Sequence, residues 1–200
     1  LSLKELSESL NFIIKRDYVF LVTYHPVTLA DEDPEVTFME LLAALDHFED
    51  YQVIFTYPNA DNGGRKIIPL LEAYAERATT RALVVQSLGH QRYLSAVKLA
   101  TAVIGNSSSG IIEVPSFHVP TVNIGSRQAG RLAAESVINC EANKSSIVNA
   151  INDAIRNKHT LSEKKVKNPY GQGNATEEVI RLIKATSFNS VKKFFNKKGA

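Results

Sequence analysis

The chain has 200 residues, of which 44% are hydrophobic and 22% are charged, a composition that supports a domain with a buried core. Its 23 Lys and Arg against 21 Asp and Glu leave a net charge of +2, which argues against a protein built mainly to bind nucleic acid. The single cysteine, Cys140, excludes a disulfide scaffold and a multi-cysteine metal cluster. We find neither an apolar run of about 20 residues nor a signal peptide, so we expect a soluble cytoplasmic protein without a membrane partner.

Short β-rich runs alternate with longer amphipathic runs along most of the chain. The first 16 residues suggest a helix whose apolar face needs a partner. Residues 18–24 form a continuous apolar run, which is typical of a strand buried on both faces. Further strands are predicted over residues 51–56, 81–86, 102–105, 119–123 and 136–139. Helices are predicted over residues 34–48, 66–77, 90–100, 110–117, 145–158 and 176–187. This alternation predicts an α/β fold, a Rossmann-like doubly wound parallel sheet covered on both faces.

Unusual polar and glycine-rich segments follow the predicted strands. Ligands of such sheets bind at the carboxyl ends of the strands, so these segments are the candidate site. They are His25 to Thr28, Asn59 to Gly64, Gly105 to Gly110 and Asn123 to Gly130.

The segment Gly105-Asn-Ser-Ser-Ser-Gly110 follows a strand and opens a helix. A helix start offers unpaired N–H groups and a positive dipole end, which suit a phosphate. The segment matches neither GxGxxG nor a P-loop, and a capped helix after a Ser/Gly turn remains the alternative. Glu113, one turn further on, is placed to accept both hydroxyls of a ribose, or only complements the helix dipole.

Other candidates stand alone in their loops. His25 precedes Pro26 and is a general acid/base, a phosphate donor or a structural histidine. Arg127 is suited to clamp a phosphate or a sugar hydroxyl. Asn59 and Asp61 form an Asx turn or bond a sugar.

Tyr93 stacks on a flat base or packs in the core. A hydrolase triad of Ser107 or Ser108 with His25 is weakly supported, since there is no GxSxG motif. No His/Asp/Glu set has metal-ligand spacing, and we predict no metal and no cofactor.

Together these motifs make the chain resemble the UDP-N-acetylglucosamine 2-epimerase family. They are His25-Pro-Val-Thr28, Asn59-Ala-Asp61-Asn-Gly-Gly64, Gly105 to Gly110 with Glu113, Asn123 to Gly130 and Tyr170-Gly-Gln-Gly-Asn174. The His-Pro-Val-Thr form resembles the hydrolysing branch used in sialic-acid and related nonulosonate pathways. The motifs span about residues 18–187 and cover only the C-terminal half of such an enzyme.

The resemblance implies a GT-B-type architecture, with two Rossmann-like domains and the active site in the cleft between them. This chain would then be an interdomain linker helix (1–16), a UDP-binding Rossmann-like domain (17–187) and a basic tail (188–200). Its partners would be the N-terminal domain of the same enzyme and further copies, in a dimer or tetramer. We interpret the tail as partly disordered, with a membrane or nucleic-acid contact as the weaker alternative.

By motif match, the resemblance assigns a role to each candidate residue. Ser107, Ser108 and the Gly110 backbone would hold the diphosphate, and Glu113 the ribose. Tyr93 and the backbone near Ser87 and Leu88 would hold the uracil. The sugar–diphosphate side would be lined by His25, Asn59, Asp61 and Arg127, with His25 assisting catalysis.

The implied reaction is anti-elimination of UDP to a glycal, followed by hydration to N-acetylmannosamine or a close relative. The acid/base carboxylates would belong to the N-terminal domain, so this chain alone is expected to bind UDP weakly and to be inactive. A GT-B glycosyltransferase and a non-catalytic interaction domain are the alternatives.

Overall fold

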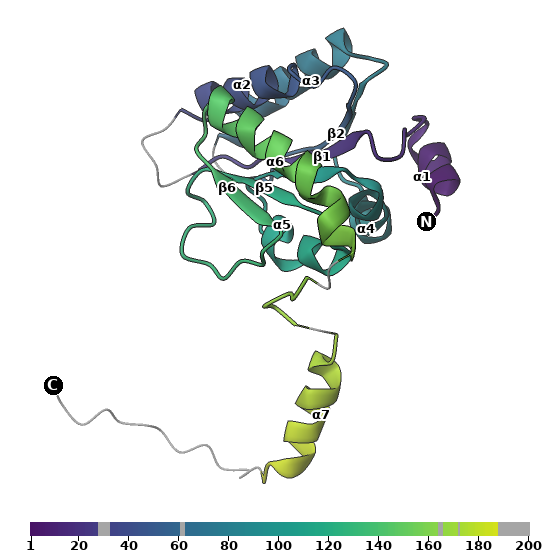
Figure 1. The fold of residues 1–200 in the computed structure, drawn as a ribbon, viewed down its shortest axis with the longest axis vertical. Helices are drawn as coiled ribbons and strands as arrows, with labels where there is room; N and C mark the ends of the chain where they lie inside the picture. The colour runs from purple at the N-terminus through teal and green to yellow at the C-terminus, as the bar shows by residue number, and fades with distance from the viewer. Residues whose placement is uncertain (28–32, 61–62, 164–165, 172, 188–200) are drawn as a thin grey trace, which may run out of the picture. The chain divides into compact units, whose positions relative to one another are not determined.

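The computed structural model describes residues 1–27, 33–60, 63–163, 166–171 and 173–187. The chain divides into two compact units, Leu1–Pro169 and Tyr170–Ala200. The first unit holds the sheet and most of the helices (Figure 1). In the second, the described residues form helix α7 (Ala175–Ala185) and the turn before it. The predicted tail, 188–200, lies outside the described residues.

A six-stranded parallel sheet forms the centre of the first unit. Its strands are β1 (Val19–Thr23), β2 (Gln52–Thr56), β3 (Ala82–Val85), β4 (Ala102–Gly105), β5 (Thr121–Ile124) and β6 (Val137–Cys140). They lie in the order β3-β2-β1-β4-β5-β6, and every pairing is parallel. The chain thus builds outward from β1 in one direction and then from β4 in the other, which is the doubly wound arrangement. The predicted Rossmann-like α/β fold is confirmed.

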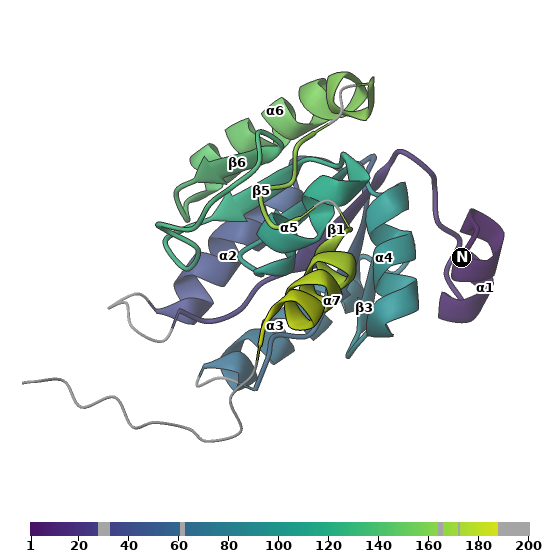
Figure 2. The same ribbon diagram turned by 90° about the horizontal axis from the view of Figure 1, so that it is seen from below.

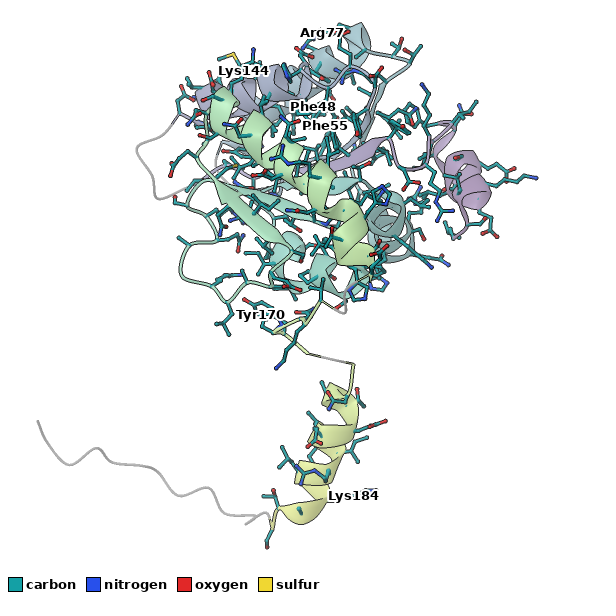
Figure 3. The ribbon with its side chains drawn as sticks, in the orientation of Figure 1. Phe48, Phe55, Arg77, Lys144, Tyr170 and Lys184 are labelled. Carbon is teal, nitrogen blue, oxygen red and sulfur yellow. The ribbon has the colours of Figure 1, made fainter. Side chains whose placement is uncertain are left out.

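Helices cover both faces of the sheet (Figures 1 and 2). One face packs against α2 (Pro34–Leu45), α3 (Gly64–Arg77) and α6 (Lys144–Glu163), and Figure 3 labels Phe48 and Phe55 within that layer. The other face packs against α1 (Leu3–Leu10), α4 (Gly89–Leu99) and the 3₁₀ helix η1 (Val114–Phe117).

Strand β1 shows why its sequence is apolar throughout. Phe20 and Val22 point into the layer of α2, α3 and α6, whereas Val19 and Leu21 point into the layer of α1, α4 and η1. Alternate residues of a strand face opposite sides, so all five positions of β1 are buried. The continuous run in the sequence therefore reflects burial on both faces.

Several helices differ from their predicted bounds: α6 continues to Glu163, beyond the predicted end at residue 158, and α2 ends at Leu45. Two further differences follow from single residues. The helix expected over residues 110–117 is divided into α5 (Ser109–Ile112) and η1, which meet at Glu113. Pro115 explains the division, since it has no N–H to donate and its ring would clash with the carbonyl four residues earlier. The helix expected within residues 1–16 ends at Leu10, because Asn11 adopts a left-handed conformation with φ of 49°.

No helix within the described ranges combines the length and the apolar character needed to cross a bilayer.

Candidate functional site

The strand order reverses between β1 and β4, and a cavity of about 420 Å³ lies at the carboxyl edge there. This is the place where doubly wound sheets bind ligands, because the loops after the two strands diverge to opposite sides. Six residues predicted from the sequence line the cavity together. They are His25, Ser87, Leu88, Tyr93, Ser107 and Glu113.

Gly105 brings the two strand ends into contact. It is the last residue of β4, it pairs with Thr23 of β1, and its φ is +134°. A Cβ at this position would lie 2.0 Å from the carbonyl oxygen of Thr23. Only glycine fits both the backbone conformation and the space, so the residue type follows from the close approach of β1 and β4.

The serine loop, Ser107 to Ser109, presents unpaired donors beside the cavity. Gly110 N–H donates to the Ser107 carbonyl at 3.1 Å, and the N–H groups of Ile111 and Ile112 donate to the Ser108 carbonyl. Among the described residues, the N–H groups of Ser107, Ser108 and Ser109 make no hydrogen bond. The first N–H groups of a helix have no partner within it, so these three are available to an anion.

The structure changes two details of the expected anion site. The Gly110 N–H is engaged inside the turn, and a Cβ on Gly110 would lie 2.7 Å from Thr121 Cγ2. Glycine is thus required there for packing. Helix α5 has four residues, so attraction of an anion would come from individual N–H groups rather than from a long helix.

Tyr93 and Glu113 line the same cavity as the serine loop. The Tyr93 hydroxyl lies 2.6 Å from Ser109 Oγ, which joins α4 to α5. Burial raises the pKa of Tyr93, the hydrogen bond with Ser109 opposes this rise, and the charge of Glu113 adds to it. Glu113 itself is half-buried at the end of α5 and lines the cavity.

His25 is bonded on its main chain and on its ring. Its N–H donates to Asn106 Oδ1 at 2.7 Å, and its carbonyl accepts from Asn106 Nδ2 at 2.8 Å. On the ring, Nδ1 accepts the Asn59 N–H at 3.0 Å. A neutral imidazole that accepts at Nδ1 carries its proton on Nε2, so the neutral side chain is a donor through Nε2.

Four of the predicted residues lie outside the cavity lining, and one lies outside the described residues. Asn59 contributes its main-chain N–H to His25, and Asn59 also lines a separate hollow at the start of α3. Arg127 Nη1 donates to the Asn106 carbonyl at 3.1 Å, so Arg127 supports the start of the serine loop. Ser108 belongs to the serine loop and Gly110 follows the loop in α5, and neither lines the cavity. Asp61 is the residue outside the described ranges.

The structure adds residues for which the sequence analysis proposed no role. Thr23 and Thr56 end β1 and β2, and their hydroxyl oxygens lie 2.7 Å apart in the cavity wall. His90, in the first turn of α4, also lines the cavity. Asn106 organises the loops and is 0% exposed. Thr56 ends a predicted strand and Asn106 directly follows one, which was the available signal, whereas Thr23 lies within a predicted strand and His90 begins a predicted helix.

A metal centre has no support in the described ranges, where no three His, Cys, Asp or Glu side chains are grouped to hold an ion.

The fold and the cavity define a doubly wound α/β domain with a cavity at its switch point. The sequence profile of the UDP-N-acetylglucosamine 2-epimerase family matches residues 2–184, and the chain belongs to this family. The predicted resemblance is thereby confirmed, and the similarity to relatives named as hydrolysing enzymes confirms the predicted branch.

Two curated relatives are similar over most of this chain. The GDP/UDP-N,N'-diacetylbacillosamine 2-epimerase (hydrolyzing) of Campylobacter jejuni is 41% identical over 143 residues, which are 72% of this chain and 37% of the relative. The polysialic acid biosynthesis protein P7 of Escherichia coli is 36% identical over 182 residues, 90% of this chain and 46% of the relative. The chain thus spans less than half the length of these two relatives.

A solved structure shares the fold. The UDP-GlcNAc 2-epimerase of Neisseria meningitidis, determined bound to UDP-GlcNAc, superposes with a TM-score of 0.65 at 15% identity. The match covers 92% of this chain and 48% of that one.

Proposed function

We propose that the cavity at the carboxyl edge binds the UDP part of a UDP-2-acetamido sugar, and that the chain is the C-terminal, UDP-binding half of a hydrolysing 2-epimerase. The observation that carries this proposal is the convergence of six predicted residues on one cavity at the switch point, beside three unpaired N–H groups. Family membership and the UDP-GlcNAc bound to the Neisseria enzyme support the same ligand class.

In this proposal, each part of the nucleotide has a matching group. The diphosphate lies against the N–H groups and hydroxyls of Ser107 and Ser108, which are donors without charge. Glu113 accepts hydrogen bonds from both ribose hydroxyls. Tyr93 and the Ser87–Leu88 backbone contact the uracil. Arg127, which bonds the Asn106 carbonyl directly before the serine loop, adds positive charge near the diphosphate.

His25 assists departure of the diphosphate. Since Nδ1 is occupied by the Asn59 N–H, the neutral imidazole offers Nε2–H to a phosphate oxygen, where negative charge develops as the bond to the anomeric carbon breaks. The resulting glycal adds water to give an N-acetylmannosamine-type sugar. The carboxylates that move the remaining protons belong to the other half of the enzyme, so this chain by itself is inactive, and full activity needs that half in a homo-oligomer.

Calorimetry with UDP, CMP and ADP tests the ligand. We expect this chain to bind UDP, weakly but in preference to the other two, because the uracil contacts discriminate between bases. UDP at 100 times its Kd should also raise the free energy of unfolding by about 2.7 kcal/mol. Equal binding of the three nucleotides would contradict the proposal, and no effect on melting would favour a non-catalytic interaction domain.

Product analysis of the full-length protein tests the reaction. With UDP-GlcNAc and no acceptor, a hydrolysing epimerase releases a free N-acetylmannosamine-type sugar and UDP. A glycosyltransferase of the same architecture would share the diphosphate and ribose contacts but would need an acceptor. Transfer to an added acceptor without release of the epimerised sugar would establish that alternative.

Substitution His25→Ala in the full-length protein tests the role of the imidazole. We expect kcat to fall by roughly 10²- to 10⁴-fold, as is typical when a proton donor is removed. The Kd for UDP should stay close to that of the wild type. The control is His159→Ala, whose side chain is exposed and does not line the cavity, and both its kcat and its Kd for UDP should match the wild type. A large loss of UDP affinity would instead mean that the bond from His25 to the phosphate serves nucleotide binding rather than departure of the diphosphate.

A further inference from the structure

Asn106 stands at the start of the loop after β4, and its side chain bonds both main-chain groups of His25. The register pairs Thr23 with Gly105, and Asn106 N–H donates to the Thr23 carbonyl at 3.2 Å. The side-chain amide therefore extends the pairing of β1 and β4 beyond the end of both strands. A carboxamide carries a neutral acceptor and a neutral donor side by side, which is what a peptide N–H and its carbonyl require.

The main-chain carbonyl of Asn106 holds a third segment. It accepts Arg127 Nη1 at 3.1 Å and Gln128 Nε2 at 2.8 Å, and Gln128 is itself buried, with 4% exposure. One residue thus connects the segments that follow β1, β4 and β5. Because Asn106 is 0% exposed, water cannot replace these bonds if the side chain is changed.

The His25 ring is fixed from a different direction. The Asn59 N–H bonds Nδ1, while the buried Pro26 follows directly and restricts the backbone of His25. Asn106 holds the main chain of His25, and its neighbour Ser107 lines the same cavity as the ring. Asn106 therefore ties the main chain of His25 to the start of the serine loop, while the Asn59 N–H bonds the ring.

We infer that Asn106 is a positioning residue, which holds the His25 imidazole at a fixed place relative to the serine loop and Arg127. This inference rests on the proposed function insofar as it concerns turnover. Asn106 does not line the cavity, so its effect on the reaction is exerted through His25.

The test is Asn106→Asp in the full-length protein, which keeps the acceptor for the His25 N–H and replaces the donor to the His25 carbonyl with a second oxygen. The chain offers a matched control in Gln52→Glu. Gln52 is also a buried amide, 4% exposed, whose Oε1 accepts the Lys15 N–H at 2.6 Å and whose Nε2 donates to the Ile13 carbonyl at 2.9 Å. It lies at the start of β2, at the opposite edge of the sheet.

For Asn106→Asp we expect kcat for the UDP-2-acetamido sugar to fall by about tenfold or more, while the Kd for UDP changes by less than about threefold. Gln52→Glu should lower the melting temperature to a similar degree but leave kcat unchanged below the melting transition. A wild-type kcat in Asn106→Asp, or a loss of kcat equal to that in the control, would overturn the inference.

The ¹⁵N spectrum of the His25 imidazole provides a readout that does not depend on turnover. We expect the Nε2-protonated tautomer in the wild type and in Gln52→Glu, and an altered ring signal in Asn106→Asp. An unchanged signal in Asn106→Asp would overturn the positioning role even if UDP turnover were confirmed. If the wild type turned over no UDP-sugar, the proposed function would fail, and the spectrum would still decide the role of Asn106.

If Asn106→Asp does not fold, hydrogen exchange of the wild-type protein tests the inference instead. The His25 N–H should then be protected from exchange to a degree comparable with the N–H groups of β1, because it is bonded to a buried Oδ1. Exchange at the rate of an exposed loop would overturn the inference.

Discussion

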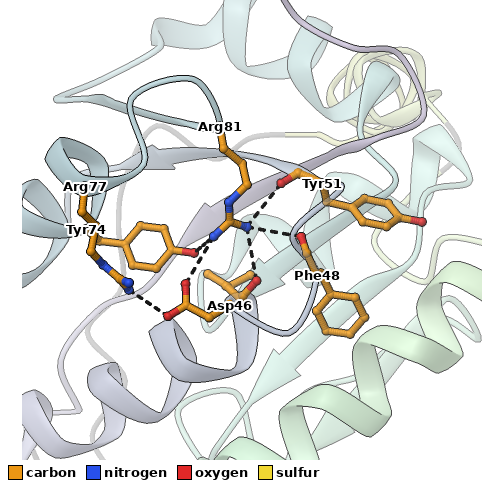
Figure 4. A network of polar contacts seen from close by, with 7 residues as sticks. Asp46, Phe48, Tyr51, Tyr74, Arg77 and Arg81 are labelled. Atoms are coloured by element: carbon orange, nitrogen blue, oxygen red, sulfur yellow. Dashed lines mark hydrogen bonds and ion pairs between the residues drawn. The ribbon is translucent and has the colours of Figure 1, made fainter.

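Around Arg81, at the amino edge of the sheet, the polar groups are paired with one another, whereas at the carboxyl edge the N–H groups of the serine loop lack a partner within the described chain. Arg81, just before β3, donates to the carbonyls of Leu45, Phe48 and Tyr51 at 3.3–3.4 Å. It also bonds Asp46 and the Tyr74 hydroxyl (Figure 4). Burial raises the pKa of Tyr74 to about 12, so its hydroxyl stays neutral in this network.

The carboxyl edge is organised differently. Gly105 joins the two central strands and Asn106 holds His25, yet the N–H groups of Ser107, Ser108 and Ser109 have no acceptor among the described residues. Unpaired donors of this kind reduce stability when buried and are useful when a ligand supplies the acceptor. The Arg81 network therefore stabilises the fold, whereas the serine loop keeps unpaired donors for the acceptors of the proposed ligand.

The largest expected loss of stability comes from a substitution at Gly105, at the carboxyl edge of the sheet. Gly105→Ala should lower the free energy of unfolding by about 4 kcal/mol, because it combines a strained backbone with a clash against the Thr23 carbonyl. The control Gly130→Ala has a φ of +77° but no atom within 4 Å of the new Cβ, so about 1 kcal/mol is expected. Urea unfolding measures both, and equal losses would contradict the close-approach argument.

A somewhat smaller effect is expected at the amino edge. Arg81→Ala should lower the free energy of unfolding by about 3 kcal/mol, because three carbonyls and Asp46 lose a charged donor. UDP affinity should not change, since the substitution is at the opposite edge. Arg77→Ala removes an exposed ion pair with Asp46 and should cost less than about 1 kcal/mol. A drop in UDP affinity for Arg81→Ala would show that the two edges are coupled.

Glu113→Ala at the carboxyl edge is expected to affect UDP binding rather than stability. The Kd for UDP should rise by a factor equivalent to about 1.5–3 kcal/mol, because charge-assisted hydrogen bonds to the ribose are lost. The free energy of unfolding should change little, in contrast to Arg81→Ala. The control is Glu135→Ala, an exposed carboxylate outside the cavity. Calorimetry gives the Kd, and an unchanged value would refute the ribose role.

The smallest effect concerns the pH dependence of stability. The hydrogen bond from Lys158 lowers the pKa of Asp17 below its ordinary value of 3.8, with Nζ 2.6 Å from Oδ1. A lowered carboxyl pKa adds stability above the unfolded pKa, and this contribution is lost as the pH falls through the folded pKa. Since Asp17 is half-exposed, less than about 1 kcal/mol is expected.

Lys158→Met tests this contribution in urea unfolding. The variant should be less stable than the wild type at about pH 7, and the difference should vanish at about pH 2. A difference that persists in acid would mean that Lys158 acts through the packing of its long side chain instead.

Much of the fold could be predicted because apolar periodicity is a local property. The run over residues 18–24 predicted β1, and the predicted ends of α2, α4 and β4 lie close to the observed ones. The division of the helix at Glu113 was missed, although Pro115 was visible. The apolar pattern over residues 110–117 favours one helix, but Pro115 has no N–H to donate within it.

The candidate site could be predicted in part. Ser107, Glu113, Tyr93 and His25 do meet at one cavity, whereas Arg127 contacts the serine loop through the Asn106 carbonyl. Asn106 itself could be seen only as part of a motif. Its role depends on a partner 81 positions away in the sequence, and no local pattern encodes such a pairing.

The amino-acid sequence by itself determined the alternation of strands and helices, and it also showed which loops carry polar groups. This is because burial and backbone preference act over a few neighbouring residues. Tertiary structure decided which strand ends are neighbours, and hence that the loops after β1 and β4 face one another. It also decided which N–H groups stay unpaired. Hydrogen bonds between distant loops depend on strand order, and strand order is set by the packing of the whole sheet and its helices.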